Sequence, residues 1–396
     1  MTAPVRADQA AAPPLFAARM RLFYFGYFLT GGIMLPFFPI WLQGRGLSEV
    51  EIANVIAIPA FIRVFLTPLA GLYADRAPNR RFATLSFTLP SAIMFLAAWP
   101  SQGYLALLLA TGIPAIIWGL AMPPAEALAL TGVRRFGLDY GRMRLTGSLG
   151  FITANLGSGA LLGVLPTDAI FWFIFASLAA STVVSFTLPV TPRQIRAIDD
   201  AAKPDQRPAW SVLGNGVFLA ILLASGLVQA SHAMLYSFGS IEWIAVRYTG
   251  FQIGLLWSAG IVCEVAMFIW STALLRRVSP YGFVIVGTVA AVVRWAAFPF
   301  APDLGMALIL QALHGLTFGA TYVGVQHLIA RMVPDEMTAS AQGIYAMMTG
   351  ILLAVATALS GPLYAASGGA AFAWMAVPPA VALVVLLFAR PRLRSA

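Results

Sequence analysis

Charged residues are scarce in this chain of 396 residues. Asp, Glu, Lys and Arg make up 10% of it, and hydrophobic residues make up 60%. A soluble globular domain carries about 25% charged residues. The deficit excludes an ordinary water-soluble fold and predicts an all-α integral membrane protein. The net charge is +9, but the basic residues are scattered between apolar runs. Nucleic-acid binding needs them gathered in one stripe, so we expect no nucleic-acid partner.

Cysteine and histidine are also rare. Cys263 is the only cysteine, and the histidines are His232, His314 and His327. One cysteine excludes an internal disulfide and any multi-cysteine metal site. The histidines do not cluster with acidic residues at metal-ligand spacing, and no nucleophile stands beside a base in a recognisable motif. We therefore expect no metal, no cofactor and no enzymatic activity.

Apolar runs bounded by charges and turn residues predict twelve transmembrane helices, because each pass needs about 20 mostly apolar residues. The predicted spans are 20–42, 49–73, 82–99, 104–131, 143–165, 168–189, 212–240, 250–275, 281–300, 304–330, 338–365 and 369–389.

Positive charge fixes the expected orientation of these spans. Of the 24 Lys and Arg residues, 20 lie in the two tails and in alternate connections, whereas the opposite connections hold only Arg45 and Arg247. The positive-inside rule then places both termini in the cytoplasm, which fits an even number of spans. We expect a multi-pass protein of a bacterial cytoplasmic (inner) membrane.

The longest connection, 190–211, is polar and rich in proline and aspartate, and it reads as a linker between two six-helix halves. The expected organisation is an N-terminal tail (1–19), a first half (20–189), the cytoplasmic linker (190–211), a second half (212–389) and a C-terminal tail (390–396). A shift of 201 residues lays 52–76 over 253–277 without a gap and pairs Arg63 with Glu264. Chance could produce such a match between apolar helices, but internal duplication is common in transporters.

The connection after the second span carries Gly71, then Asp75 and Arg76, then Arg80 and Arg81. Glycine permits close helix approach, and an aspartate at a helix end can pair with arginines or with a neighbouring helix terminus. This segment resembles the loop signature of the major facilitator superfamily and is interpreted as a gate. An ordinary basic cytoplasmic loop is the alternative.

Further motifs resemble the phenylpropionate permease group of that superfamily, relatives of the lactose permease and of oligosaccharide and nucleoside proton symporters. They run from about residue 20 to 390. The segments are 24–28, 36–42, 231–233, 240–243, 254–264, 294–295 and 313–318. The resemblance implies the major facilitator fold of twelve helices in two halves and a transport function.

Ionisable residues inside the spans mark candidate functional positions, because a charge near the bilayer centre costs at least about 2.5–3.5 kcal/mol. Glu264, Arg294 and His314 stand on the eighth, ninth and tenth spans and can meet between the halves. Glu126 and Arg144 form a second candidate pair near the cytoplasmic ends of the fourth and fifth spans. Pro123 and Pro124 directly precede Glu126 and predict a break in the fourth span, because they free backbone carbonyls in the turn before them. A purely structural ion-pair role is the alternative for Arg63, Glu264 and Arg294.

The resemblance implies roles for these residues. Proton coupling is expected of Glu264, His314, Arg294 and Glu126. Substrate contact is expected of Arg144, Arg63, Arg294, His232, Tyr236 and Trp257, although the aromatic residues could equally be packing. In the lactose permease a carboxylate follows the histidine by one turn, whereas Thr317 occupies that position here, so Glu264 becomes the expected carrier of the proton.

The expected function is a proton-coupled symporter that imports a small organic solute, an aromatic or other organic acid above all, by alternating access. Arginines inside the spans favour a carboxylate substrate. Proton-driven export of drugs or metabolites, or symport of a sugar or nucleoside, are the alternatives. A channel would show pore rings or a filter sequence, and the sequence has neither. The expected partners are the solute, protons and membrane lipid, with the chain acting as a monomer.

Overall fold

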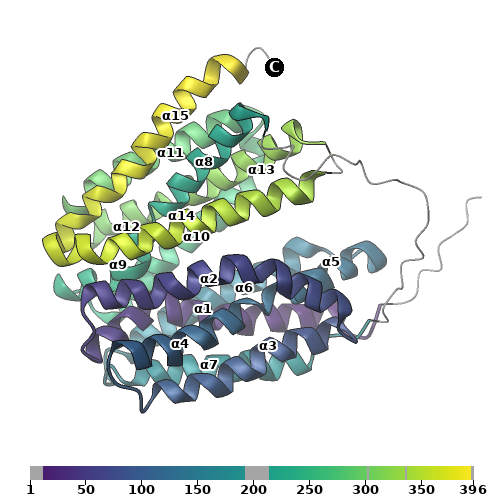
Figure 1. Ribbon diagram of the computed structural model, residues 1–396, viewed down its shortest axis with the longest axis vertical. Coiled ribbons are helices and arrows are strands. Elements are labelled where there is room, and N and C mark those ends of the chain that lie inside the picture. Colours follow the sequence, from purple (N-terminus) through teal and green to yellow (C-terminus); the bar gives the residue numbers. More distant parts are fainter. Residues whose placement is uncertain (1–11, 192–213, 301–302, 335–336, 394–396) are drawn as a thin grey trace, which may run out of the picture.

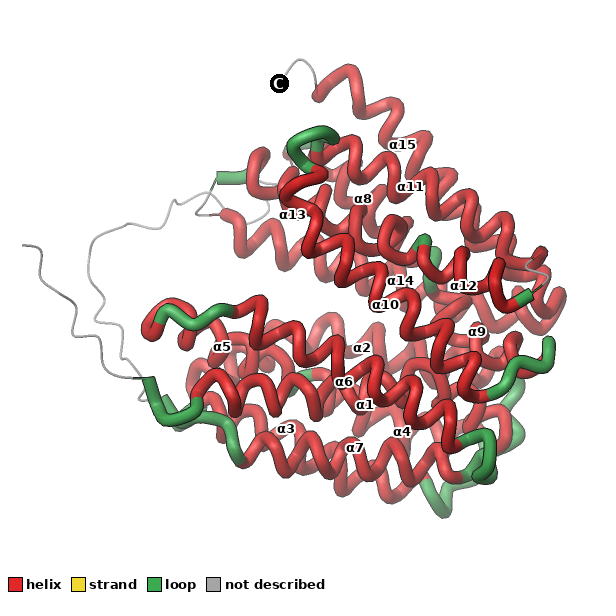
Figure 2. The backbone as a smooth tube through the Cα atoms, turned by 180° about the vertical axis from the view of Figure 1, so that it is seen from behind, coloured by secondary structure: helices red, strands yellow, loops and turns green. Residues whose placement is uncertain are grey.

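A computed structural model describes residues 12–191, 214–300, 303–334 and 337–393 of the chain. Within these ranges the secondary structure is helical, and turns or short loops join the helices (Figure 2). The predicted linker, 190–211, falls almost wholly outside them and stays a prediction.

Seven α-helices form the first half of the chain (Figure 1). They are α1 (Phe16–Gly44), α2 (Glu49–Arg76), α3 (Arg80–Phe95), α4 (Tyr104–Gly119), α5 (Met122–Phe136), α6 (Tyr140–Leu161) and α7 (Ala169–Phe186). The second half begins with α8 (Gly216–Ala230), α9 (Ala233–Ala245), α10 (Gly250–Leu274), α11 (Pro280–Ala297) and α12 (Leu304–Ala312). It continues with the π-helix η4 (Gly315–Ala320), α13 (Thr321–Met332), α14 (Thr338–Ser367), the 3₁₀-helix η6 (Gly368–Ala376) and α15 (Val377–Leu393).

These helices make twelve passes in the described part of the chain, as predicted. Ten stretches are long and apolar enough to cross a membrane. Nine hold one pass each, and the tenth, Ser340–Ala389, holds two, because η6 turns the chain between α14 and α15. The remaining pass, the fifth along the chain, is α6, whose arginines and glycines lower its hydropathy.

Three passes are broken near their middle. The fourth breaks between α4 and α5, directly before Pro123 and Pro124, as the two prolines predict. The seventh breaks at Ser231 and His232, and the tenth widens into the π-helix η4, which starts after His314. Neither of the latter two breaks has a proline at its centre. In membrane proteins such breaks are tolerated where the backbone is buried in protein or lines a site.

The two halves meet at one end and diverge at the other (Figures 1 and 2). At the closed end α2 packs on α14 and α6 packs on α10. Glycines allow this approach: a Cβ at Gly361 would lie 2.9 Å from the Glu49 carbonyl oxygen, and one at Gly254 would lie 2.9 Å from the Asn155 carbonyl carbon. Small residues let helix backbones come this close in a membrane bundle.

The predicted duplication agrees with how α2 and α10 begin. Ser48 and Glu51 form a capping box at the start of α2, and Thr249 and Gln252 form another at the start of α10, each offset by 201 residues. Each helix then packs against the other half, α2 against α14 and α10 against α6.

Some helix bounds differ from the predicted spans by several residues. The predicted N-terminal tail, 1–19, includes the start of α1, and the predicted C-terminal tail, 390–396, includes the end of α15. The first helix opens with Phe16, Ala17 and Ala18, ahead of Arg19, and α15 continues through Arg390 and Arg392 to Leu393. The seventh pass runs to Ala245 rather than to 240.

Candidate functional site

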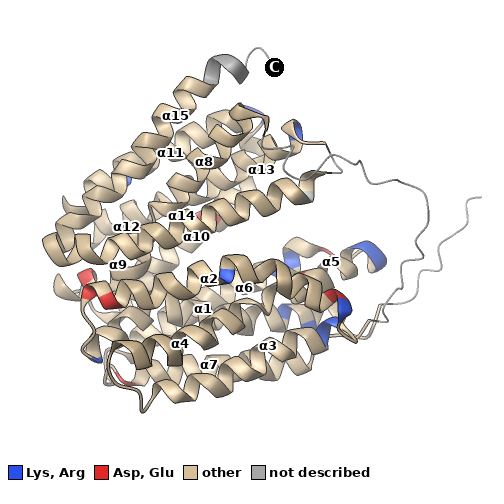
Figure 3. Cartoon of the chain, in the orientation of Figure 1, with Lys and Arg blue, Asp and Glu red and all other residues tan. Residues whose placement is uncertain are grey.

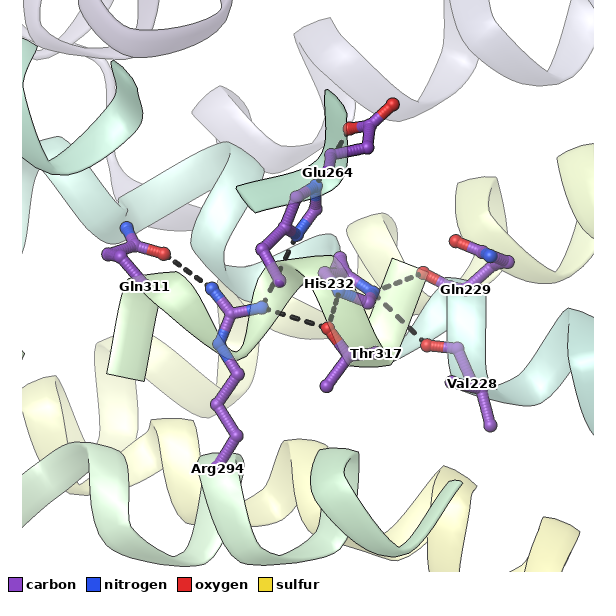
Figure 4. A network of polar contacts seen from close by, with 8 residues as sticks. Val228, Gln229, His232, Glu264, Arg294, Gln311 and Thr317 are labelled. Atoms are coloured by element: carbon purple, nitrogen blue, oxygen red, sulfur yellow. Dashed lines mark hydrogen bonds and ion pairs between the residues drawn. The ribbon is translucent and has the colours of Figure 1, made fainter. Parts of the chain in front are cut away.

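Arg294 anchors a polar cluster in the second half (Figure 4). It lies in the last turn of α11 and is fully buried. Its Nη1 donates to Thr317 Oγ1 at 3.1 Å and to His314 Nδ1 at 3.3 Å, and its Nη2 donates to the side-chain oxygen of Gln311. Its guanidinium also lies over the Trp295 ring at 4.5 Å. All of its hydrogen-bond acceptors within the described residues are therefore neutral.

Glu264 joins this cluster through His314. The His314 Nε2 lies 3.4 Å from Glu264 Oε2, and the two side chains are 9% and 19% exposed. Because His314 Nδ1 accepts from Arg294, the neutral ring carries its proton on Nε2, the nitrogen that lies beside the carboxylate. The three residues predicted to meet thus lie together, with the imidazole between the cation and the acid.

His232, at the break in the seventh pass, forms a hydrogen bond with Thr317 of the π-helix η4. Its Nδ1 lies 3.1 Å and 3.2 Å from the carbonyl oxygens of Val228 and Gln229, so Nδ1 is the donor. Its Nε2 then accepts from the Thr317 hydroxyl at 3.0 Å. Thr317 receives one hydrogen bond from Arg294 and gives one to His232. This threonine stands where the lactose permease has a carboxylate, and it holds the two side chains together without adding a negative charge.

Arg294 and His232 are fully buried, so neither is presented to a solute in this conformation. Tyr236 and Trp257 extend the cluster: the Tyr236 ring stacks between His232 at 5.8 Å and Trp257 at 6.1 Å. The Trp257 Nε1 donates to Ser240 at 2.8 Å. Both aromatic residues are thus part of the packed wall of the second half.

A second polar cluster lies in the first half. Arg144 Nε of α6 is 3.7 Å from Glu126 Oε1 of α5, and the Tyr140 hydroxyl donates to the other oxygen of Glu126 at 2.9 Å. The Arg144 guanidinium lies over the Phe28 ring at 4.0 Å. Arg144 and Glu126 are 35% and 26% exposed, so this predicted pair is formed but remains open to water and to solutes.

Arg63 lies apart from both clusters, in the middle of α2. Its guanidinium rests against Gly119, where a Cβ would come within 2.6 Å of Nη1. Tyr27 is within its electrostatic range and stacks on Trp118 at 4.2 Å. No ion pair or hydrogen bond joins the Arg63 guanidinium to another described residue. The alternative of a structural ion pair for Arg63 finds no partner among them.

The charges of the two halves act on each other. Arg144 is within electrostatic range of Glu264, and both Arg144 and Glu126 act on Tyr322 of α13. The cation of the first half thus faces the carboxylate of the second, although no hydrogen bond joins them in the described residues.

The segment interpreted as a gate lies at the diverging end, where Figure 3 shows basic residues at the ends of α2 and α3. Arg80 pairs with Asp75 at 2.5 Å, inside the segment itself, and Arg81 donates to the Phe186 carbonyl at 3.4 Å. Arg76 is exposed. A Cβ at Gly71 would meet nothing within 4 Å. The close helix approach expected at Gly71 is absent in this conformation.

Several residues of these clusters were not predicted. Gln311 and Thr317 bind Arg294, and Tyr140 binds Glu126. The sequence does contain a signal for Gln311 and Thr317. Gln311, His314 and Thr317 follow one another at intervals of three, so neighbouring members of this series lie on the same side of the helix.

The known proteins that resemble this chain are membrane transporters. Residues 17–376 match the family described as MFS_1 like. The probable 3-phenylpropionic acid transporter of Escherichia coli (strain K12) is 32% identical over 94% of this chain and 97% of its own length. The maltose permease of Geobacillus stearothermophilus is 25% identical over 95% of each chain. The crystal structure of the nucleoside transporter NupG superposes with a TM-score of 0.81 at 17% identity, covering 95% of this chain and 98% of that one.

Proposed function

Because the chain belongs to the MFS_1 like family of major facilitator transporters, we propose that it is a proton-coupled symporter that imports a small organic acid by alternating access. It is a multi-pass membrane transporter and not an enzyme. The coupling ion is proposed to be the proton, and the substrate is proposed to be an organic acid. The observation that carries it is the series Arg294, His314 and Glu264, in which a neutral imidazole links a buried cation to a partly exposed carboxylate.

Glu264 is the proposed proton carrier. A carboxyl group in a poorly hydrated site favours its neutral form, whereas a nearby cation favours the anion. Glu264 lies beside His314 Nε2 and within the electrostatic field of Arg144. A substrate carboxylate that binds Arg144 screens that field, so Glu264 then takes up a proton more readily. Proton and substrate in this way favour each other's binding, which is what symport requires.

The proposed substrate site lies on the first half, with Arg144 and Arg63 as the cations. Arg63 has no anionic partner among the described residues, and it lies within electrostatic range of Tyr27, whose ring stacks on Trp118. An unpaired guanidinium next to aromatic faces suits an aromatic carboxylate. The name of the Escherichia coli relative, a probable 3-phenylpropionic acid transporter, supports this class, whereas the maltose permease keeps sugars as the alternative.

The proposed location is a bacterial inner membrane, with both termini in the cytoplasm and the chain acting as a monomer. The two tails and alternate connections carry 20 of the 24 basic residues, which supports this orientation. The diverging end, where the Gly71–Arg81 segment lies, then faces the cytoplasm, and the conformation described is open inward.

The experiment is uptake of labelled 3-phenylpropionic acid, and separately of maltose, into proteoliposomes with an acidic outside. We expect saturable uptake of the acid that collapses when the pH gradient is removed. Glu264→Gln should abolish gradient-driven uptake and keep exchange of internal for external substrate. Asp168→Asn, a change at the start of α7 where the aspartate makes no capping hydrogen bond, is the matched control. Unimpaired gradient-driven uptake by Glu264→Gln would exclude this residue as the carrier.

A further inference from the structure

A cavity of about 340 Å³ lies in the first half, between α2, α3 and the break in the fourth pass. Its lining residues are Leu66, Leu69, Ala70, Tyr73, Ser86, Phe87 and Leu120. Leu120 is the residue after α4, directly before α5 begins to turn away. The cavity therefore adjoins the place where the fourth pass is interrupted, and it involves none of the residues assigned to substrate or proton.

The cavity faces away from the other half of the protein. Val64 of α2 points at α14, because a Cβ added at Gly350 would lie 2.6 Å from Val64 Cγ2. Leu66 and Tyr73 are rotated by about 180–200° from Val64, since each residue of an α-helix adds about 100°. Leu69 is 56% exposed and Tyr73 is 39% exposed. This side of α2 therefore meets the bilayer rather than the space between the halves.

The lining suits a hydrocarbon chain. Its two hydroxyl groups are already satisfied: Tyr73 donates to Ser86 Oγ at 2.8 Å, and Ser86 donates to the Phe82 carbonyl at 2.9 Å. The Tyr73 and Phe87 rings meet edge to face at 5.5 Å. A polar solute would leave its own groups without partners here, which costs free energy, whereas an acyl chain would not.

Unpaired positive charge lies at the cytoplasmic rim of the cavity. Arg76 follows Tyr73 by three residues, about 4.5 Å along the helix, and it is exposed with no ion pair or hydrogen bond to another described residue. Arg81, the second residue of α3, is turned away from the cavity and donates to the Phe186 carbonyl of α7 at 3.4 Å. Asp75, the acid nearby, is already paired with Arg80. The rim thus offers one unpaired cation, Arg76, where the headgroup of a lipid would sit.

We propose that this is a binding site for an anionic phospholipid, with one acyl chain in the cavity and the phosphate beside Arg76. The two parts of the site follow each other along α2, with the apolar wall inside the membrane and Arg76 at the membrane surface. Basic residues at the cytoplasmic side of membrane helices attract anionic headgroups in this way. The site is independent of the substrate proposed above.

Native mass spectrometry of the full chain in detergent tests the headgroup. The probes are dioleoylphosphatidylglycerol, dioleoylphosphatidylcholine with the same chains, and glycerol 3-phosphate without chains. We expect the first to bind more tightly than the second, and the third not to bind. Arg76→Gln should weaken phosphatidylglycerol binding about fivefold, the effect of one basic residue near an anionic headgroup. Arg277→Gln is the matched control, because Arg277 is the 201-residue counterpart of Arg76.

A second variant tests the acyl chain. Leu69→Trp fills the cavity and should lower the affinity for phosphatidylglycerol and phosphatidylcholine alike, whereas Leu109→Trp, at an equally exposed position of α4, should leave both unchanged. Thermal unfolding of each variant establishes that it is folded. Equal affinity of the two lipids for the wild-type chain would overturn the charge part of the proposal. Unchanged lipid binding in folded Leu69→Trp would overturn the cavity part, and binding of glycerol 3-phosphate alone would show a phosphate site and not a lipid site.

Discussion

Gly71 of α2 and Gly343 of α14 stand opposite each other in one antiparallel register, and neither touches the other half. Val64 packs against Gly350, and eleven residues toward the closed end Ala53 packs against Gly361. Seven residues in the other direction, the same register pairs Gly71 with Gly343. A Cβ at either glycine would meet nothing within 4 Å. The two glycines are thus the contact that α2 and α14 would make if the open end closed.

Gly71→Leu or Gly343→Leu should therefore slow transport by keeping the open end from closing. Overpacking of a close contact costs about 1–3 kcal/mol, so we expect uptake to fall by about five- to a hundredfold. Thermal stability of the resting state should not fall, because a leucine in a helix is favoured over glycine. Gly157→Leu is the control, since Gly157 of α6 also has open space around it. Uptake at the level of this control would contradict the closure at Gly71 and Gly343.

A substitution at the closed end should act in the opposite direction. At Gly254 a Cβ would lie 2.9 Å from the Asn155 carbonyl carbon and 3.3 Å from the Leu156 Cα. Gly254→Leu cannot keep α10 against α6, so the population should shift toward a state open at this end. Distances between spin labels placed across each end, measured by pulsed electron paramagnetic resonance, should lengthen at the closed end and shorten at the open end. An unchanged distribution in a folded variant would disprove this.

Thr317→Val should loosen the second-half cluster while leaving its volume almost unchanged. The valine removes the hydroxyl that accepts from Arg294 and donates to His232. Buried groups left without a partner cost about 1–3 kcal/mol each. Thermal unfolding in detergent should show a lower midpoint for Thr317→Val, and Thr317→Ser, which keeps the hydroxyl, should restore most of it. Equal midpoints for the two variants would mean that the hydroxyl contributes nothing.

Arg63→Gln should weaken the binding of a carboxylate without destabilising the fold, because Arg63 has no ion-pair partner among the described residues. A hydrogen bond to a charged group contributes about 1.5–3 kcal/mol, so the affinity for 3-phenylpropionic acid should fall by roughly ten- to a hundredfold. The amide of the same acid, which lacks the charge, should lose little. Isothermal titration with both ligands measures the difference, and Arg134→Gln at the exposed end of α5 is the control. Equal losses for acid and amide would place the carboxylate elsewhere.

The sequence predicted the passes well because their signal is local. Apolar length and the alternation of basic connections depend only on neighbouring residues, and the proline pair before Glu126 correctly predicted the break in the fourth pass. The one pass with too little hydropathy, α6, was still predicted as the span 143–165, an apolar run bounded by charges and turn residues.

The details of the site were less predictable because they depend on contacts between helices. Nothing in the segment around His232 requires a break; the break exists together with the hydrogen bonds from His232 to Val228, Gln229 and Thr317. The π-helix after His314 likewise brings Thr317 to Arg294. Sequence reasoning named Glu264, His314 and Arg294 as a group, but not that the imidazole would lie between the other two.

The equivalence of Arg63 and Glu264 has a consequence for how a solute is held. Each residue comes fifteen positions after the capping residue of its helix, Ser48 or Thr249, so the internal symmetry of the chain exchanges a cation for an anion. A binding space with identical halves would accept an elongated molecule in two opposite poses. Here the two helices match in backbone, but the charge is positive at Arg63 and negative at Glu264. A molecule with a single charged end is therefore left with one pose.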